Sequence, residues 1–175
     1  MSAAEPGAAG RTAAVIIAST RAAGGSYPDR TGPILVEWLR DRGFAVGGPT
    51  VVADGPEVSA ALRAAVHGND GRPGVDLVIT SGGTGISPTD RTPQMTADLL
   101  DYQIPGLAAA IRAEGSEKVP TAVLSRGLAG VAGRTLVINL PGSTGGVRDG
   151  LAVLGRVLDH ALDQLRGGDH PSGGV

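Results

Sequence analysis

Residues 76–94 read DLVITSGGTGISPTDRTPQ, and this stretch sets the interpretation of the whole chain. A short apolar run ends abruptly in a loop of glycine and hydroxyl residues, and Asp90 follows a few positions later. Short apolar runs bounded by turn residues are typical of strands buried on both faces of a parallel sheet. Glycines let the backbone turn tightly and approach a ligand closely. The stretch therefore predicts a buried strand over residues 74–80 that ends at a candidate binding loop.

The segments on either side alternate between strand and helix patterns. Further strands are predicted at 12–18, 44–54, 120–126 and 134–142, and helices at 32–43, at 56–68, from Pro93 with Thr92 as its cap, after the break at 104–106, and at 147–165. Strands that alternate with helices predict a three-layer α/β/α fold around a mostly parallel sheet. Since the chain shows no repeat and no interior linker, residues 11–166 are expected to form one domain between mobile tails at 1–10 and 167–175.

The composition narrows the classes of function. The chain has 175 residues, of which 41% are hydrophobic but only 2% aromatic, so an aliphatic core is expected. A net charge of -2 gives no general attraction to nucleic acid or to an anionic membrane. The lack of cysteine excludes disulfides, thiol catalysis and Cys-ligated zinc. No run approaches the roughly 18 apolar residues of a membrane span, and the N-terminus lacks a signal-peptide pattern, so we expect a cytoplasmic protein.

Ligands of such sheets bind beyond the carboxyl ends of the strands. The glycine loop lies at one such end, and its amides could converge on phosphate oxygens; the residues predicted to bind are Ser81, Gly82, Gly83, Thr84 and Gly85. The helix near Pro93 is expected to add the positive end of its dipole. A plain strand-to-helix turn is the alternative, but a second glycine turn, PGSTGG at 141–146, favours a ligand site. The loop is neither a P-loop, since no glycine precedes Lys-Ser or Lys-Thr, nor a dinucleotide fingerprint.

Two aspartates follow predicted strands. Asp90 beside a phosphate-binding loop would be repelled unless a divalent cation lay between them, and Asp54 is expected at a neighbouring strand end. The two carboxylates could therefore share a magnesium ion. Alternatively, Asp54 caps the helix that starts near residue 56, and Asp90 is a turn residue that bonds its own backbone. Arg21, Arg91 and Arg126 either balance phosphate charge or are solvated surface residues.

Four motifs extend these observations to a family. SGGTGISPTD (81–90), IPG (104–106), VPTAVLSRG (119–127) and INLPGS (138–143) occur in this order and at similar spacing in the molybdopterin adenylyltransferases. The chain resembles this family, which includes the bacterial Mog-type proteins and the G domain of gephyrin, over nearly all of residues 12–165. The arrangement looks especially similar to the small actinobacterial Mog proteins.

The resemblance implies that ATP and molybdopterin are converted to adenylylated molybdopterin and pyrophosphate, with Mg²⁺ as cofactor and a homotrimeric assembly. The two functionally important aspartates of the family correspond to Asp54 and Asp90, which are also the expected magnesium ligands. Its pterin and nucleotide contacts correspond to 81–85 and to a second group near the last strands, namely Ser125, Pro141, Gly142 and Ser143. The ligands are small molecules; neither nucleic acid nor a membrane is expected as a partner.

Two positions depart from the family pattern. Ser-Asp-Arg in the first loop is replaced by Ser19-Thr20-Arg21, and Ser-Pro-Lys after the last strand is replaced by Ser143-Thr144-Gly145. A carboxylate and a phosphate-neutralising lysine are therefore missing, and arginines or backbone amides must bind the phosphates instead. An inactive molybdopterin-binding scaffold and a nucleotide pyrophosphatase remain as alternative functions.

Overall fold

The computed structural model describes residues 10–168. Residues 1–9 and 169–175, most of the two predicted tails, lie outside the described residues. In chain order the elements are β1 (Thr12–Ala18), α1 (Thr20–Ala23), α2 (Gly32–Asp41), β2 (Ala45–Val46), β3 (Thr50–Val52), α3 (Pro56–His67), β4 (Leu77–Ser81), α4 (Thr92–Ala97), β5 (Tyr102–Gln103), α5 (Pro105–Ser116), the 3-10 helix η1 (Pro120–Leu124), β6 (Ala129–Ala132), β7 (Thr135–Leu140) and α6 (Thr144–Leu165).

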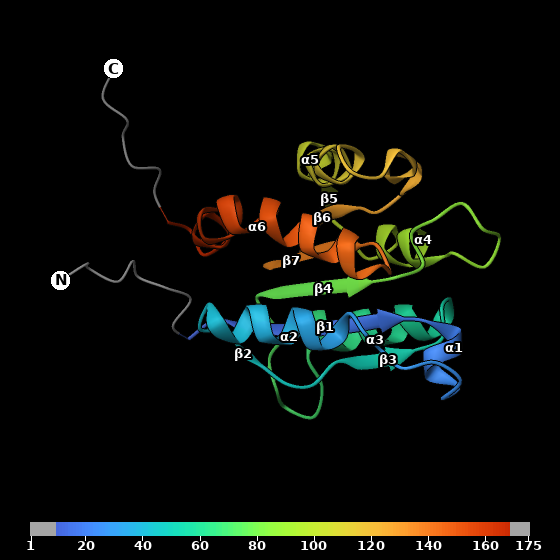
Figure 1. Cartoon of the computed structure of the whole chain (residues 1–175). Coiled ribbons are helices and arrows are strands. Elements are labelled where there is room, and N and C mark those ends of the chain that lie inside the picture. The colour runs from blue at the N-terminus through green and yellow to red at the C-terminus, as the bar shows by residue number, and fades with distance from the viewer. Residues whose placement is uncertain (1–9, 169–175) are drawn as a thin grey trace, which may run out of the picture.

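All seven strands join one sheet (Figure 1). Its order is β2-β1-β4-β7-β6-β5, and β3 pairs with β1 further along the same edge as β2. β1 is parallel to β2, β3 and β4, and β4 is parallel to β7. Among the strands of residues 10–168, β6 alone runs opposite to the rest, and it is antiparallel to both β5 and β7. The predicted mostly parallel sheet is therefore confirmed.

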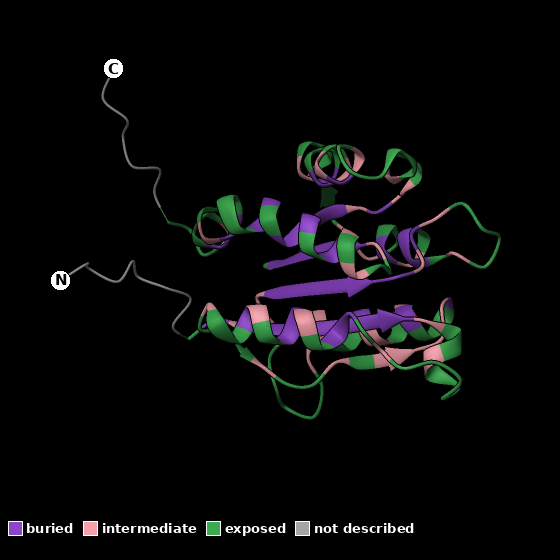
Figure 2. Cartoon of the chain, in the orientation of Figure 1, coloured by how far each residue is buried: buried purple, intermediate pink, exposed green. Residues whose placement is uncertain are grey.

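Alternate side chains of the central strands enter two separate cores. In β1, Val15 and Ile17 pack in one cluster with α2, α5 and α6, whereas Ile16 packs in the other with α3 and α4. Successive residues of a strand point to opposite faces, so an uninterrupted apolar run serves both layers. Figure 1 shows α2 and α6 in front of the sheet and α3 and α4 behind it, and Figure 2 shows β1 and β4 buried between these layers. The predicted α/β/α sandwich is confirmed.

The prediction of a strand at 120–126 is wrong. This segment forms η1, and its apolar side chains stay on the surface, where Val123 is 62% exposed. Proline begins the turn because its φ angle suits a helical first residue and its missing N–H needs no partner there. The strand of this region is instead β6, a run of small residues that pairs with β7.

Two other boundaries differ from the predictions. The strand expected at 44–54 is split into β2 and β3 at Gly47, Gly48 and Pro49, because proline cannot donate to a ladder and glycine weakens a strand. Arg91, not Thr92, is the N-cap of α4, and its side chain makes no capping hydrogen bond; the Thr92 hydroxyl donates to Asp54 instead. The strand at 12–18 is as predicted, and the long closing helix ends at Leu165 as predicted but begins three residues earlier, at Thr144.

Within residues 10–168, no helix combines the length and the apolar character needed to cross a membrane. The parallel strands β1, β3, β4 and β7 run in the same direction, so their carboxyl ends meet at one edge of the sheet. That edge carries both glycine turns and both aspartates singled out above.

Candidate functional site

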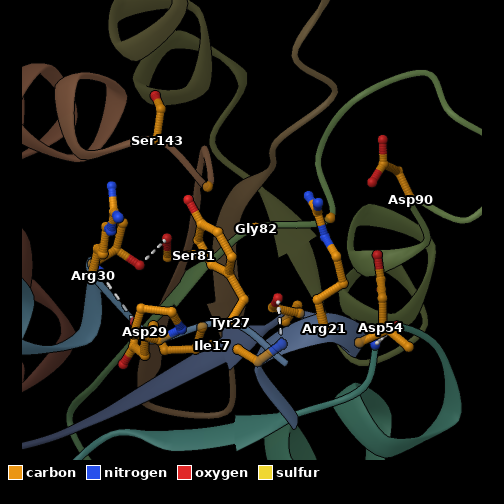
Figure 3. A pocket seen from close by; sticks show the side chains of 18 of the residues that line it. Ile17, Arg21, Tyr27, Asp29, Arg30, Asp54, Ser81, Gly82, Asp90 and Ser143 are labelled. Atoms are coloured by element: carbon orange, nitrogen blue, oxygen red, sulfur yellow. Dashed lines mark hydrogen bonds between the residues drawn. The ribbon is translucent and has the colours of Figure 1, made fainter. Parts of the chain in front are cut away.

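A cavity of about 580 Å³ opens at the carboxyl edge of the parallel strands (Figure 3). Of the predicted site residues, the cavity is lined by Asp54, Ser81, Gly82, Gly83, Asp90, Gly142 and Ser143. A second hollow, of about 530 Å³, lies at the opposite edge of the sheet and contains none of them. Most of the residues expected to act together are thus collected in one place, and both aspartates are among them.

The glycine loop runs so close to the neighbouring strands that side chains would not fit. Gly82 has φ +99°, a conformation that L-residues rarely adopt, and a Cβ atom there would collide with the carbonyl oxygen of Ala18 at the end of β1. A Cβ atom on Gly142 would lie 3.3 Å from Gly82 Cα, so the two glycine turns touch. Gly82 N also donates to Leu140 O at 3.0 Å, which joins the loop to β7.

The remaining glycines make room for the two aspartates. A Cβ atom on Gly83 would collide with the Asp54 carboxylate, and one on Gly85 would lie 2.6 Å from Asp90 Oδ2. Both carboxylates therefore pack directly against the backbone of this loop, and Figure 3 shows them on the same side of the cavity. Ser87 N donates to Asp90 Oδ2 at 3.2 Å, so Asp90 also forms the predicted turn, in a hydrogen bond that leaves Oδ1 unused.

The Asp54 carboxylate binds the start of α4. Arg91 N donates to Oδ2 at 3.0 Å and Thr92 Oγ1 donates to Oδ1 at 3.1 Å. Gly55, with φ 116°, precedes α3, so Asp54 is not the side-chain cap of that helix. The positive end of the α4 dipole thus lies against an aspartate of the chain, whereas a direct role for it at a ligand had been expected.

A buried polar network supports α4 from beneath. Asn139, which is 3% exposed, donates from Nδ2 to Thr80 Oγ1 and to Thr96 Oγ1, both at 3.0 Å. Its Oδ1 accepts from Leu128 N at 3.0 Å. Thr96 Oγ1 in turn donates to Thr92 O at 2.8 Å, in the same residue whose hydroxyl binds Asp54. Hydrogen bonds therefore connect β7 to the aspartate through α4.

Arg126 holds the glycine loop from outside the cavity. Its guanidinium donates from Nε to Gly85 O at 2.8 Å and from Nη2 to Asp90 O at 2.7 Å. Its amide donates to Thr84 O at 2.8 Å. Thr84 is itself buried, and its hydroxyl lies 3.3 Å from that of Ser125. These residues shape the loop, whereas the predicted ligand contacts of Thr84, Gly85, Ser125 and Pro141 lie outside the cavity lining and stay predictions.

The hydroxyl groups near the 141–146 turn have two roles: one is buried in hydrogen bonds within the protein, and others line the cavity. Ser81 Oγ is hydrogen-bonded to Pro141 O at 2.8 Å and to Thr31 Oγ1 at 2.9 Å, and the residue is buried. Ser143 caps α6 by accepting from Gly146 N at 3.0 Å, and both Ser143 and Thr144 line the cavity. The first turn of this 22-residue helix therefore borders the cavity and brings the positive end of its dipole there.

The loop between β1 and α2 contributes residues that sequence reasoning missed. Tyr27, Asp29 and Arg30 line the cavity beside Arg21, which had been considered as a phosphate partner. Asp29 Oδ1 accepts from Thr31 N at 3.1 Å and from Gly32 N at 2.9 Å, so it shapes the entry to α2. The only signal in the sequence that could have identified these residues is their position, because the segment that contains them follows the buried strand at 12–18. Arg91, the remaining candidate for phosphate charge, is exposed and does not line the cavity.

Comparison with known proteins identifies the family of the chain that carries this site. Residues 14–160 match the family described as "Probable molybdopterin binding domain". The chain belongs to this family. It is 62% identical to the Mog molybdopterin biosynthesis protein of Mycobacterium ulcerans, with a TM-score of 0.83 over 89% of this chain and 99% of that structure.

Two curated relatives carry related names. The "Molybdenum cofactor biosynthesis bifunctional protein" of Synechococcus elongatus is 39% identical over 163 residues, 93% of this chain and 50% of that protein. The "Molybdopterin adenylyltransferase" of Helicobacter pylori is 37% identical over 92 residues, 53% of this chain and 52% of that protein. The chain thus spans about half the length of these two relatives. Together with the family match, they support a place in molybdenum cofactor biosynthesis.

In this molybdopterin-binding domain, the carboxylates of Asp54 and Asp90 suit a cation whose remaining ligands are substrate phosphates and water. Within residues 10–168, His, Cys, Asp and Glu side chains do not gather in groups of three or more that could hold a metal. Asp54 and Asp90, however, lie against the same loop and line the same cavity. Mg²⁺ is commonly bound by one or two carboxylates, substrate phosphates and water, so this pair fits it when a phosphorylated ligand is present.

Proposed function

We propose that the chain is a molybdopterin adenylyltransferase, which transfers AMP from ATP to the phosphate of molybdopterin and releases pyrophosphate. The observation that carries this proposal is the meeting of Asp54 and Asp90 with two glycine turns in one cavity. Exposed backbone, a helix N-terminus and paired carboxylates are groups that bind phosphates and their counter-ion. The name of the Helicobacter pylori relative supports the same reaction.

The reaction asks for positioning more than for covalent chemistry. The phosphate of molybdopterin would attack the α-phosphorus of ATP in line with the departing pyrophosphate, and it is already ionised at pH 7. No side chain therefore has to remove a proton from the nucleophile. The cavity offers backbone at Gly83 and Gly142 to fix the phosphates and the first turn of α6 to bind their charge, whereas the Gly82 amide is already bonded to Leu140 O.

Asp54 and Asp90 would hold the magnesium ion, which supplies positive charge to the phosphate oxygens when bound. The surrounding contacts fix both carboxylates in advance. Asp54 is held by α4, and Asp90 is held by its own turn and by Arg126 on its carbonyl. Such preorganisation limits the rearrangement needed during the reaction.

The test is to incubate the protein with molybdopterin, ATP and Mg²⁺ and to measure adenylylated pterin by mass spectrometry and pyrophosphate release. Asp90→Asn keeps the shape of the side chain but removes its charge, so we expect turnover to fall by about 100-fold or more. Asp41→Asn, at an exposed aspartate outside the cavity, is the matched control and should leave turnover unchanged. Normal turnover of the Asp90 variant at saturating Mg²⁺ would contradict the assigned role.

Two outcomes would replace the proposal. Binding of molybdopterin without ATP-dependent release of pyrophosphate would indicate a binding or scaffold protein. Release of pyrophosphate or AMP from ATP without any pterin would indicate a nucleotide pyrophosphatase, although no water-activating base is evident among the residues described above.

We further propose that the protein forms homotrimers, as the family resemblance implies. Val119, Val123 and Leu124 are exposed on and beside η1, and they give an apolar surface that a second copy of the chain could cover. Light scattering on the purified protein measures the assembly directly, and a monomeric mass at micromolar concentration would refute this part.

A further inference from the structure

A tyrosine lies between two arginines in the cavity. The guanidinium carbons of Arg21 and Arg30 lie 5.6 and 5.4 Å from the centroid of the Tyr27 ring. All three residues line the cavity, and Figure 3 shows the arginines on opposite sides of the tyrosine. We call these three residues the Tyr27 cluster; Arg21 lies in α1, and Tyr27 and Arg30 lie in the loop between α1 and α2.

The Tyr27 cluster has unused binding capacity. Tyr27 keeps 47% of its surface exposed, and it is the one aromatic residue among those that line this cavity in the described chain. Within residues 10–168, the guanidinium groups of Arg21 and Arg30 form neither a salt bridge nor a hydrogen bond. Two like charges beside one ring repel each other, so an anion that binds both would relieve the repulsion.

Three carboxylates line the cavity, those of Asp29, Asp54 and Asp90, and within residues 10–168 none of them forms an ion pair with Arg21 or Arg30. Asp29 instead accepts the amides of Thr31 and Gly32, and Asp54 accepts the amide and hydroxyl groups at the start of α4. The cluster thus offers a flat aromatic surface and two free cations at the same place. That combination matches a ligand that joins a planar heterocycle to phosphate groups.

We propose that Tyr27 stacks on the base of ATP while Arg21 and Arg30 bind its polyphosphate. This inference rests on the proposed function, in which ATP is a substrate. Stacking on an aromatic ring is stronger than an exposed cation–π contact, so a base can replace a guanidinium at the ring and release it for the phosphates. A triphosphate carries more negative charge than the single phosphate of molybdopterin, and two unpaired cations therefore favour the nucleotide. In this way the arginines take over the role of the lysine that is missing after Ser143.

Binding measurements separate the ring from the charges. We would titrate the protein with ATP, with inorganic tripolyphosphate and with molybdopterin, in the presence of Mg²⁺, by calorimetry. Tyr27→Ala should weaken the binding of ATP by about 5- to 150-fold, which is the usual effect of losing one base stack. The same substitution should leave the affinity for tripolyphosphate unchanged. Tyr27→Phe should bind ATP like the unmodified protein. Arg21→Gln and Arg30→Gln should each weaken the binding of both ATP and tripolyphosphate by about tenfold or more.

The second tyrosine of the chain provides the matched control. Tyr102 is 56% exposed on β5 and does not line the cavity, so Tyr102→Ala should bind ATP normally. Because Tyr27 is half exposed, its replacement should leave the melting temperature nearly unchanged, which separates lost binding from lost folding. ATP binding unaffected by Tyr27→Ala would overturn the inference, and so would equal weakening of ATP and tripolyphosphate, or weakening of molybdopterin alone.

The test also separates this inference from the proposed function. If the unmodified protein binds ATP through Tyr27 but forms no adenylylated molybdopterin, the transferase assignment fails and the nucleotide site stands. If product forms at a normal rate and Tyr27→Ala binds ATP normally, the Tyr27 cluster has no role in nucleotide binding and the transferase assignment stands.

Discussion

Replacing Asn139 by alanine should destabilise the protein by removing the centre of the buried network. The substitution deletes two donated hydrogen bonds, to Thr80 and Thr96, each worth about 0.5–1.5 kcal/mol net. It also leaves Leu128 N without its acceptor, at a cost of about 1–3 kcal/mol. The sum is about 2–6 kcal/mol, which for a chain of this size corresponds to a decrease in Tm of roughly 5–20 °C.

Thermal unfolding followed by circular dichroism measures this decrease, and urea unfolding gives the free energy directly. Asn69→Ala is the matched control, because the only other asparagine of the chain is exposed, and we expect a change within about 0.5 kcal/mol. Asn139→Ala should also reduce turnover at a temperature where it remains folded, since Thr96 and Thr92 connect the network to Asp54. A Tm within about 2 °C of the unmodified protein would show that the network contributes little.

Three further perturbations test other parts of the structure. Gly82→Ala combines a strained positive φ with a collision at Ala18, so the free energy of unfolding should fall by about 2–5 kcal/mol and the urea midpoint should decrease. An unchanged midpoint would contradict the packing of the loop. Burial raises the pKa of Asp76, but hydrogen bonds from Thr12 and Arg166 outweigh it, and the pKa is lowered overall. Its stabilisation is therefore present above the ordinary aspartate pKa of about 4 and lost as pH falls through the lower folded-state pKa. Asp76→Asn should accordingly lower Tm at pH 7, with a difference that shrinks in acid, and a constant difference across pH would refute this. Arg126→Gln should raise KM and lower kcat, because its guanidinium holds the glycine loop, and unchanged kinetics would argue against that role.

The central strands were predictable because their sequences carry the signal locally. An uninterrupted apolar run such as 12–18 leaves few alternatives to a strand buried on both faces. β6 has no such signal: Gly130 is required there because a Cβ atom would lie 2.5 Å from Tyr102 O on β5. That contact depends on a strand distant in sequence. The apolar run at 120–126 has the composition of a strand, but its side chains lie on the surface. The limits of one domain, residues 11–166, stay a prediction.

The site was predictable where residues follow strands or the loops that end them. Asp54 and the two glycine turns were found in the first way and Asp90 in the second, and the structure brings them into one cavity. Tyr27 was missed because a single aromatic residue in a long loop has no periodicity or motif to mark it. The support given by Asn139 was missed for a different reason: its partners come from three separate segments, and only their packing makes them neighbours.

The short outer strands restrict how copies of this chain can associate. One edge of the sheet is β5, a strand of two residues, and the other is divided between β2 and β3, with Gly47, Gly48 and Pro49 between them. Neither edge offers a long row of unpaired backbone groups onto which a strand of another molecule could add. A continuous intermolecular sheet is therefore disfavoured, and with it a common route to aggregation. Association through helices and loops is favoured instead, and it leaves the ladder of each copy intact.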